Sequence, residues 1–214
     1  SVLPGPHSSA AWTSFSTGAN PGKHGIGDWR SKTGYDFHPV TGDDIKPPRF
    51  WETLSDAGKT VGVFNIPLTS PPEPVRGVSV TSWTSVSGQF ASPPSFQAKL
   101  ENIDYKRQAD FLSHDDEVSN LLYSIERRGK GVELFCDEFD WDLLVAMFYE
   151  TEQAHHQFAP FIDQDHPLHD PKEIDSVRRV YKAVDEEIGK IRARVGPQTP
   201  FIVMSDHGFC PIYE

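Results

Sequence analysis

The stretch PFIVMSDHGF, residues 200–209, decides the fold class that we expect for this chain. Its apolar run does not alternate with polar residues, which predicts a buried strand over 201–205, covered by helices on both faces. Asp206 and His207 follow this run directly. Open α/β sheets bind ligands at the carboxyl ends of their strands, so we expect both side chains to point into such a crevice. A solvated loop after the strand is the alternative interpretation.

Other apolar runs in the chain alternate with helical patterns. TVGVFNI (60–66) and LLVAMFY (143–149) indicate two more buried strands. The segment RFWETLSDAG (49–58) predicts a helix that ends at its glycine, just before the first of these strands. This alternation predicts an α/β fold with a doubly wound, mainly parallel sheet sandwiched by helices.

The clearest helical pattern follows Asp170. We expect Asp170 to be the N-cap, Pro171 the first helical residue and Glu173 the partner in a capping box. An apolar stripe then recurs at three- and four-residue steps until Gly196 ends the helix. The stripe consists of Ile174, Val177, Tyr181, Val184, Ile188, Ile191 and Val195.

A further helix is expected to begin at Ser113 and to turn its apolar residues toward the sheet. Those residues are Val118, Leu121, Leu122 and Ile125. The segment 67–94 is rich in Pro, Ser and Gly and has no sustained period, which predicts a long loop or small cap. We therefore expect one domain over residues 1–214, in which residues 67–113 form a loop or cap region.

Composition excludes several classes of function. The 214 residues are 37% hydrophobic and 24% charged, as in ordinary globular proteins, and the net charge is −11. A chain this acidic, without Lys/Arg clusters, is not expected to bind nucleic acid or a membrane surface. No apolar run is long enough to cross a bilayer. The two cysteines, Cys136 and Cys210, are too few for a disulfide framework, which favours a reducing, cytoplasmic location.

Two carboxylate and histidine pairs follow separate expected strands. If a helical turn begins after Glu150, then Glu152 and His156 lie four residues apart on one face and can bind one ion, with His155 as a spare. Asp206 and His207 form the second pair. Carboxylate and imidazole ligands suit zinc or another divalent first-row metal, whereas solvated polar turns are the alternative. The repetition of this chemistry at two strand ends predicts a two-metal site, which usually has a hydrolytic function.

A nucleophile for such a site is expected at the start of a helix. Ser8 and Ser9 precede AAWTSFST, and Gly18 closes that helical segment. A serine at this position lies among free backbone N–H groups, at the positive end of the helix dipole, where a phosphate would also bind. The alternative is that the serine is a plain helix cap.

Several blocks together resemble one known family, the type I phosphodiesterase/nucleotide pyrophosphatase branch of the alkaline phosphatase superfamily. The blocks occur in the family's order and cover most of the chain. They are SSAAWTSFSTGANPGKHGI (8–26), FWETLSDAGKTVGVFNIPLTSPPEPVRG (50–77), FYETEQAHHQF (148–158), VYKAVDEEIGKI (180–191) and VMSDHGF (203–209). The resemblance implies an alkaline phosphatase-like α/β sandwich with two metal ions, usually zinc, at the carboxyl ends of the strands; manganese and iron stay open.

The resemblance also implies roles for single residues. The family's nucleophile, a Thr or Ser ten residues before the glycine of a TG pair, falls on Ser8, which would form a covalent phospho-enzyme. Asp206 and His207 match ligands of the metal that activates this nucleophile. Glu152 and His156 match ligands of the second metal, although relatives usually carry Asp in place of Glu152. The implied substrate is a small phosphodiester or phosphomonoester, whose leaving group the sequence does not identify.

Two elements of the family pattern have no counterpart in this sequence. Relatives have a metal-binding Asp at the end of a first strand and another His well after the SDHG block. We therefore expect a fragment or shortened relative with an incomplete core, whose missing ligands come from the full-length protein or a partner chain. A noncatalytic binding or assembly module of the same fold is the alternative function. A sulfatase is less favoured, because Ser8 is not followed by the Pro and Arg that sulfatases require.

Overall fold

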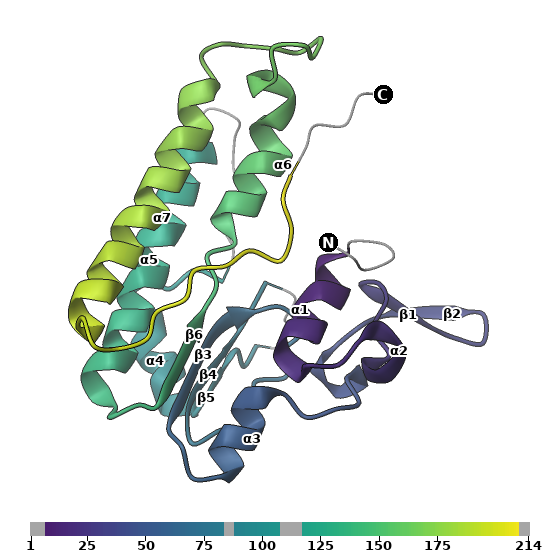
Figure 1. Cartoon of the computed structure of the whole chain (residues 1–214), viewed down its shortest axis with the longest axis vertical. Coiled ribbons are helices and arrows are strands. Elements are labelled where there is room, and N and C mark those ends of the chain that lie inside the picture. The colour runs from purple at the N-terminus through teal and green to yellow at the C-terminus, as the bar shows by residue number, and fades with distance from the viewer. Residues whose placement is uncertain (1–6, 84–87, 108–116, 210–214) are drawn as a thin grey trace. The chain divides into compact units, whose positions relative to one another are not determined.

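The computed structural model describes residues 7–83, 88–107 and 117–209 (Figure 1). These residues divide into two compact units. Unit 1 contains the described residues of 1–102, 137–147 and 204–207, and unit 2 contains those of 103–136, 148–203 and 208–214.

A four-stranded mixed sheet forms the centre of unit 1 (Figure 1). Its strands, in the order β5-β4-β3-β6, are β5 (Ala91–Ser92), β4 (Gly77–Thr81), β3 (Val61–Ile66) and β6 (Leu143–Ala146). β3 pairs in parallel with both β4 and β6, and β4 pairs antiparallel with β5. Every residue of β3 is buried, as its unbroken apolar run predicts. The α/β class and the strands expected near 60–66 and 143–149 are therefore confirmed.

Short helices and a hairpin complete unit 1. They are α1 (Ser8–Thr17), α2 (Pro21–His24), β1 (Arg30–Thr33), β2 (Asp36–Pro39), the 3-10 turn η1 (Gly42–Asp44), α3 (Phe50–Asp56) and α4 (Pro94–Asn102). α1 ends where Gly18 adopts a left-handed φ of 65°, and α3 is followed by Gly58 with φ of 80°. The helices expected at both places are confirmed. The ring of Phe15 in α1 meets that of Phe50 in α3 edge-on at 5.5 Å, which fixes α1 against α3.

Three helices make up most of unit 2: α5 (Glu117–Glu138), α6 (Glu150–Ile162) and α7 (Ile174–Val195) (Figure 1). Side chains from all three helices form one apolar core. Its buried members are Leu121, Ile125, Ala154, Phe158, Val177, Val180 and Val184. The helix expected from Ser113 is thus present from Glu117 onward, and its expected start lies outside the described residues. Cys136 lies in α5 and is partly buried, whereas Cys210 lies outside the described residues.

The start and the buried face of α7 differ from expectation. The helix begins at Ile174, because Asp170 accepts a hydrogen bond from the Lys172 backbone N–H (3.0 Å) and closes a local turn instead of capping the helix. Val180 is buried in α7, whereas Tyr181 is 48% exposed. The apolar face is therefore rotated by about one residue from the predicted stripe at this turn of the helix.

The strand expected over Phe201–Ser205 is absent. The segment is irregular (Figure 1), and Ile202 and Val203 are 84% and 68% exposed. An apolar run becomes a strand only where a neighbouring strand supplies backbone hydrogen bonds, and no strand among the described residues pairs with it.

The loop expected over 67–94 is also only partly correct. It contains β4, whose residues Val78–Thr81 are buried next to β3. The sequence GVSVT lies between Pro- and Ser-rich flanks. Its alternation of apolar and polar residues is too short to predict a strand. Residues 84–87 and 108–113 of the expected loop or cap region lie outside the described residues.

Candidate active site

Ser8 is the first helical residue of α1 and is buried, with 8% of its surface exposed. The N-cap position is occupied by His7, whose side chain makes no capping hydrogen bond. The Ser8 Oγ instead shares a hydrogen bond of 2.8 Å with Nε2 of His207, 199 positions away in the sequence. Ser8 is therefore not a plain helix cap, because its hydroxyl faces His207.

Asp206 approaches the same histidine nitrogen. Its Oδ2 lies 3.4 Å from Nε2 of His207, and this oxygen is buried without a hydrogen-bond partner among the described residues. The Ser205 Oγ donates to the backbone carbonyl of His207 (2.6 Å), which stabilises the turn that carries the pair. A Ser-His-Asp relay needs the carboxylate at Nδ1, so this arrangement is not such a relay.

Asp206 Oδ2 and His207 Nε2 have the donor chemistry of a zinc site, and Ser8 Oγ contacts the same nitrogen. Ligands of a tetrahedral zinc site lie about 2.0–2.2 Å from the metal and hence roughly 3.3 Å from one another. The observed separations of 2.8 and 3.4 Å from Nε2 are close to that value. The unpartnered Asp206 oxygen gives a second reason, since a buried carboxylate oxygen normally has a donor or a cation. Within the described ranges, no three His, Cys, Asp or Glu residues form a metal-binding group by themselves.

The second expected pair lies on α6 in unit 2. Glu152 Oε1 and His156 Nε2 are 3.6 Å apart on successive turns of the helix. The Glu152 side chain is 21% exposed and that of His156 is 64% exposed. Both atoms can therefore bind a cation from one face of α6, as the four-residue spacing predicts.

His155, the expected spare ligand, is already engaged. Its Nε2 lies 2.8 Å from the Tyr181 hydroxyl, and the two rings meet edge-on. Burial, together with the charge of His156, lowers the pKa of His155 and favours its neutral form. Of the two adjacent histidines, His156 is thus the one with a ring nitrogen directed toward Glu152.

A model of the type I phosphodiesterase / nucleotide pyrophosphatase family matches residues 3–214 of the sequence. The chain belongs to this family. No curated protein and no solved structure matches it. The family consists of hydrolases, so this phosphodiesterase-family chain is related to enzymes that cleave phosphodiester and pyrophosphate bonds.

A buried ion pair holds the first turn of α6 in this phosphodiesterase-family chain. Glu150 and Arg128 of α5 are both fully buried, and Arg128 Nη2 donates to Glu150 Oε1 at 2.7 Å. The Ser124 hydroxyl donates to the same oxygen (2.6 Å), and Arg128 Nη1 donates to the Tyr105 hydroxyl (3.3 Å). This network was not predicted. Its only sequence signal is that Arg128 lies three residues after Ile125, on the apolar side of α5.

Asn65 is a second feature that the sequence did not indicate. It lies near the carboxyl end of β3, is fully buried, and has a left-handed φ of 62°. Both polar atoms of its amide are buried without a hydrogen-bond partner among the described residues. Strained, unsatisfied polar residues cluster at functional sites more often than elsewhere. Its position is the strand end at which α/β proteins bind ligands.

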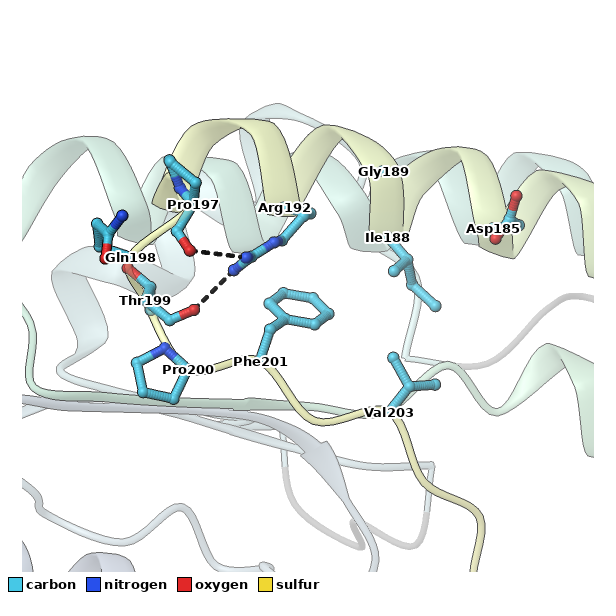
Figure 2. Close-up of a pocket in the computed structure, with 10 residues that line it drawn as sticks. All are labelled: Asp185, Ile188, Gly189, Arg192, Pro197, Gln198, Thr199, Pro200, Phe201 and Val203. Atoms are coloured by element: carbon cyan, nitrogen blue, oxygen red, sulfur yellow. Dashed lines mark hydrogen bonds between the residues drawn. The ribbon is translucent and has the colours of Figure 1, made fainter.

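A cavity in unit 2 is separate from the candidate residues. It has a volume of about 650 Å³ and lies beside α7 and residues 197–203. Figure 2 shows Arg192 directed toward the carbonyl oxygens of Thr199 and Pro197, to which it donates at 2.7 and 3.0 Å. Its guanidinium is thus already used to hold this segment, and none of the candidate site residues lines the cavity. No helix among the described residues is long and apolar enough to span a membrane.

Proposed function

We propose that this chain hydrolyses phosphodiester or phosphomonoester bonds through a phosphoseryl intermediate on Ser8, at a site with two divalent metal ions. The observation that supports this best is the approach of Ser8 Oγ and Asp206 Oδ2 to one nitrogen of His207. A serine hydroxyl, a carboxylate and an imidazole from opposite ends of the chain have no evident structural reason to meet there. Family membership supplies the reaction class.

Ser8 would attack the phosphorus atom of the substrate. The new Oγ–P bond forms as the bond to the leaving oxygen breaks, and the hydroxyl gives up its proton while the leaving oxygen takes one up. Water then attacks phosphorus, the Oγ–P bond breaks, and a proton from the water restores the Ser8 hydroxyl. At the first turn of α1, backbone N–H groups and the positive end of the helix dipole favour the negative charge of the phosphoryl oxygens. The side chain is buried, and its contact with His207 fixes its direction for attack.

The family is typically metal-dependent, which supports the proposed metal ions. Asp206 and His207 would hold one ion, and Glu152 and His156 the other; zinc suits these donors best, and manganese and iron are compatible. Such ions polarise phosphoryl oxygens and lower the pKa of a nucleophile. We also propose that the sheet is doubly wound.

Replacement of Ser8 tests the proposal. We predict that Ser8→Ala, loaded with zinc, loses roughly a thousandfold or more of its hydrolysis rate on an aryl phosphodiester such as bis(4-nitrophenyl) phosphate. Ser8→Thr keeps a hydroxyl and is expected to retain measurable activity and to trap phosphate on residue 8 when quenched with acid. Zinc content measured alongside separates a chemical defect from a loss of metal.

Two other results would contradict parts of the proposal. An unchanged rate in Ser8→Ala would exclude Ser8 as the nucleophile. A wild-type chain that binds zinc but hydrolyses neither phosphodiesters nor phosphomonoesters would favour the alternative of a noncatalytic binding module.

A further inference from the structure

The ring of Phe209 lies against two neighbouring histidines of α6. It stacks on His155, with ring centroids 4.9 Å apart and an interplanar angle of 20°. It meets His156 edge-on, at 5.3 Å and 86°. All three residues belong to unit 2. One phenyl ring therefore contacts both the engaged histidine and the proposed metal ligand.

The His155 imidazole, on which the Phe209 ring stacks, is itself held in place. It is held by the Tyr181 hydroxyl at 2.8 Å and by an edge-on contact with the Tyr181 ring at 5.6 Å. Tyr181, His155 and Phe209 thus form a chain of ring contacts, edge-on between Tyr181 and His155 and stacked between His155 and Phe209.

His156 needs such support because little else restricts it. Its side chain is 64% exposed, and its polar contact to Glu152 is long, at 3.6 Å. An exposed imidazole on a helix samples several rotamers, and ordering it costs conformational entropy when it binds a ligand. A metal-binding histidine is usually oriented by a hydrogen-bonding neighbour, and loss of that neighbour typically lowers metal affinity 10–100-fold, which we take as the scale for an orienting ring contact.

We infer that Phe209 is a positioning residue, which orients the His156 imidazole for metal binding through the ring contact that it makes while stacked on His155. This inference rests on the proposed function, since it assigns His156 to a metal ion. It adds a residue outside the expected ligand set.

Zinc binding measured by calorimetry tests the inference. The measurements are made in an Asp206→Ala background, so that the heat reports the ion at Glu152 and His156. Phe209→Ala is expected to weaken zinc affinity about tenfold or more, whereas Phe209→Tyr, which keeps the ring, should retain it. Ile202→Ala, at an 84% exposed position of the same segment, is the matched control and should leave the affinity unchanged. His156→Ala gives the reference for complete loss of the ligand.

A second readout needs no metal. In the metal-free protein, NMR signals of the His155 and His156 ring protons should shift in Phe209→Ala, because the ring current of the phenyl group is lost, and should stay near their wild-type positions in Phe209→Tyr. Unchanged signals, or unchanged zinc affinity in Phe209→Ala beside a wild type that binds zinc, would overturn the role of Phe209 alone. A parent chain with Asp206 intact that binds no zinc would overturn the proposed metal site and, with it, this inference.

Discussion

Buried polar side chains in the described residues are of two kinds. His24 is satisfied, because the Ile26 N–H donates to its Nδ1 at 3.1 Å and its Nε2 lies 3.0 Å from the Ser14 Oγ. Burial lowers the pKa of His24, so the neutral ring can accept and donate at once. Asn65 and Asp206 instead carry atoms that find no hydrogen-bond partner within the described part of the chain, which costs about 1–3 kcal/mol for each buried group. The first kind stabilises the fold, and the second marks places where a ligand or an ordered water would bind.

Gly77 is a single residue on which the sheet depends. It begins β4 opposite Val61 of β3, and its φ is 127°. A Cβ at this position would overlap the backbone carbonyl oxygen of Val61, which cannot move without breaking the strand pairing. We predict that Gly77→Ala lowers the free energy of unfolding by roughly 1–3 kcal/mol from backbone strain alone. Gly27→Ala, where a Cβ meets no atom within 4 Å, is the control. Equal urea midpoints for the two variants would contradict this account.

The sequence indicates a candidate site residue only where residues close to it in the sequence form a recognisable pattern. Ser8, Asp206 and His207 are candidates from the sequence because their chemistry coincides with a local pattern, a helix start or an apolar run. The contact of Ser8 with His207 spans 199 positions, and no local pattern encodes it. Glu150 and Asn65 were missed because a buried polar side chain differs from an exposed one only through its tertiary surroundings.

At the scale of secondary structure elements, α6 is held at its start by the ion pair of Glu150 and Arg128. Both side chains are fully buried, so removal of one leaves the other charge without compensation. We predict that Glu150→Gln lowers the free energy of unfolding by about 3–5 kcal/mol. Because the same turn carries Glu152, zinc affinity at the α6 pair should also fall. Urea denaturation and zinc calorimetry measure the two effects.

Two variants control this prediction. Glu186→Gln removes an exposed partner of Lys182 on α7 and should cost at most about 1 kcal/mol. The double variant Arg128→Met, Glu150→Leu removes both charges and should recover most of the lost stability. If the double variant is as unstable as Glu150→Gln, packing rather than charge compensation explains the loss.

Secondary structure elements were predictable from the sequence where a single effect, such as the burial of an apolar run, determines them. β3 is buried on all sides, so its apolar run was sufficient. The segment Phe201–Ser205 has an equally apolar run, but a strand also needs a neighbour, which the run cannot encode. For α7 the apolar period was clear, whereas its first residue depended on a competition between a cap and a local turn at Asp170.

At the scale of the whole molecule, the stability of the chain should depend on pH through one buried carboxyl group. Glu73, in the segment that joins β3 to β4, contacts Arg49 Nη1 at 2.5 Å and accepts a hydrogen bond from the Trp51 indole (2.6 Å). Burial raises the pKa of Glu73 to about 7, although Arg49 and Trp51 act in the opposite direction and Glu52 and Asp43 add to the rise. Arg49 also donates to the carbonyl oxygen of Leu68 (2.9 Å), so this cluster fixes the start of the segment after β3.

The sign of the effect follows from where the proton is bound. An unfolded Glu73 ionises near its ordinary pKa of 4.5, whereas the folded one keeps its proton up to about 7. Between these values the folded state binds more protons, so the free energy of unfolding falls as pH rises through this window and levels off above it. Glu73→Gln cannot ionise, so we predict that wild type loses on the order of 3 kcal/mol relative to this variant across the window. Urea denaturation from about pH 4 to about pH 8 measures the difference. Glu101→Gln on the exposed side of α4 reports the general effect of removing one negative charge. A constant gap between wild type and Glu73→Gln would show that folding does not shift the pKa of Glu73.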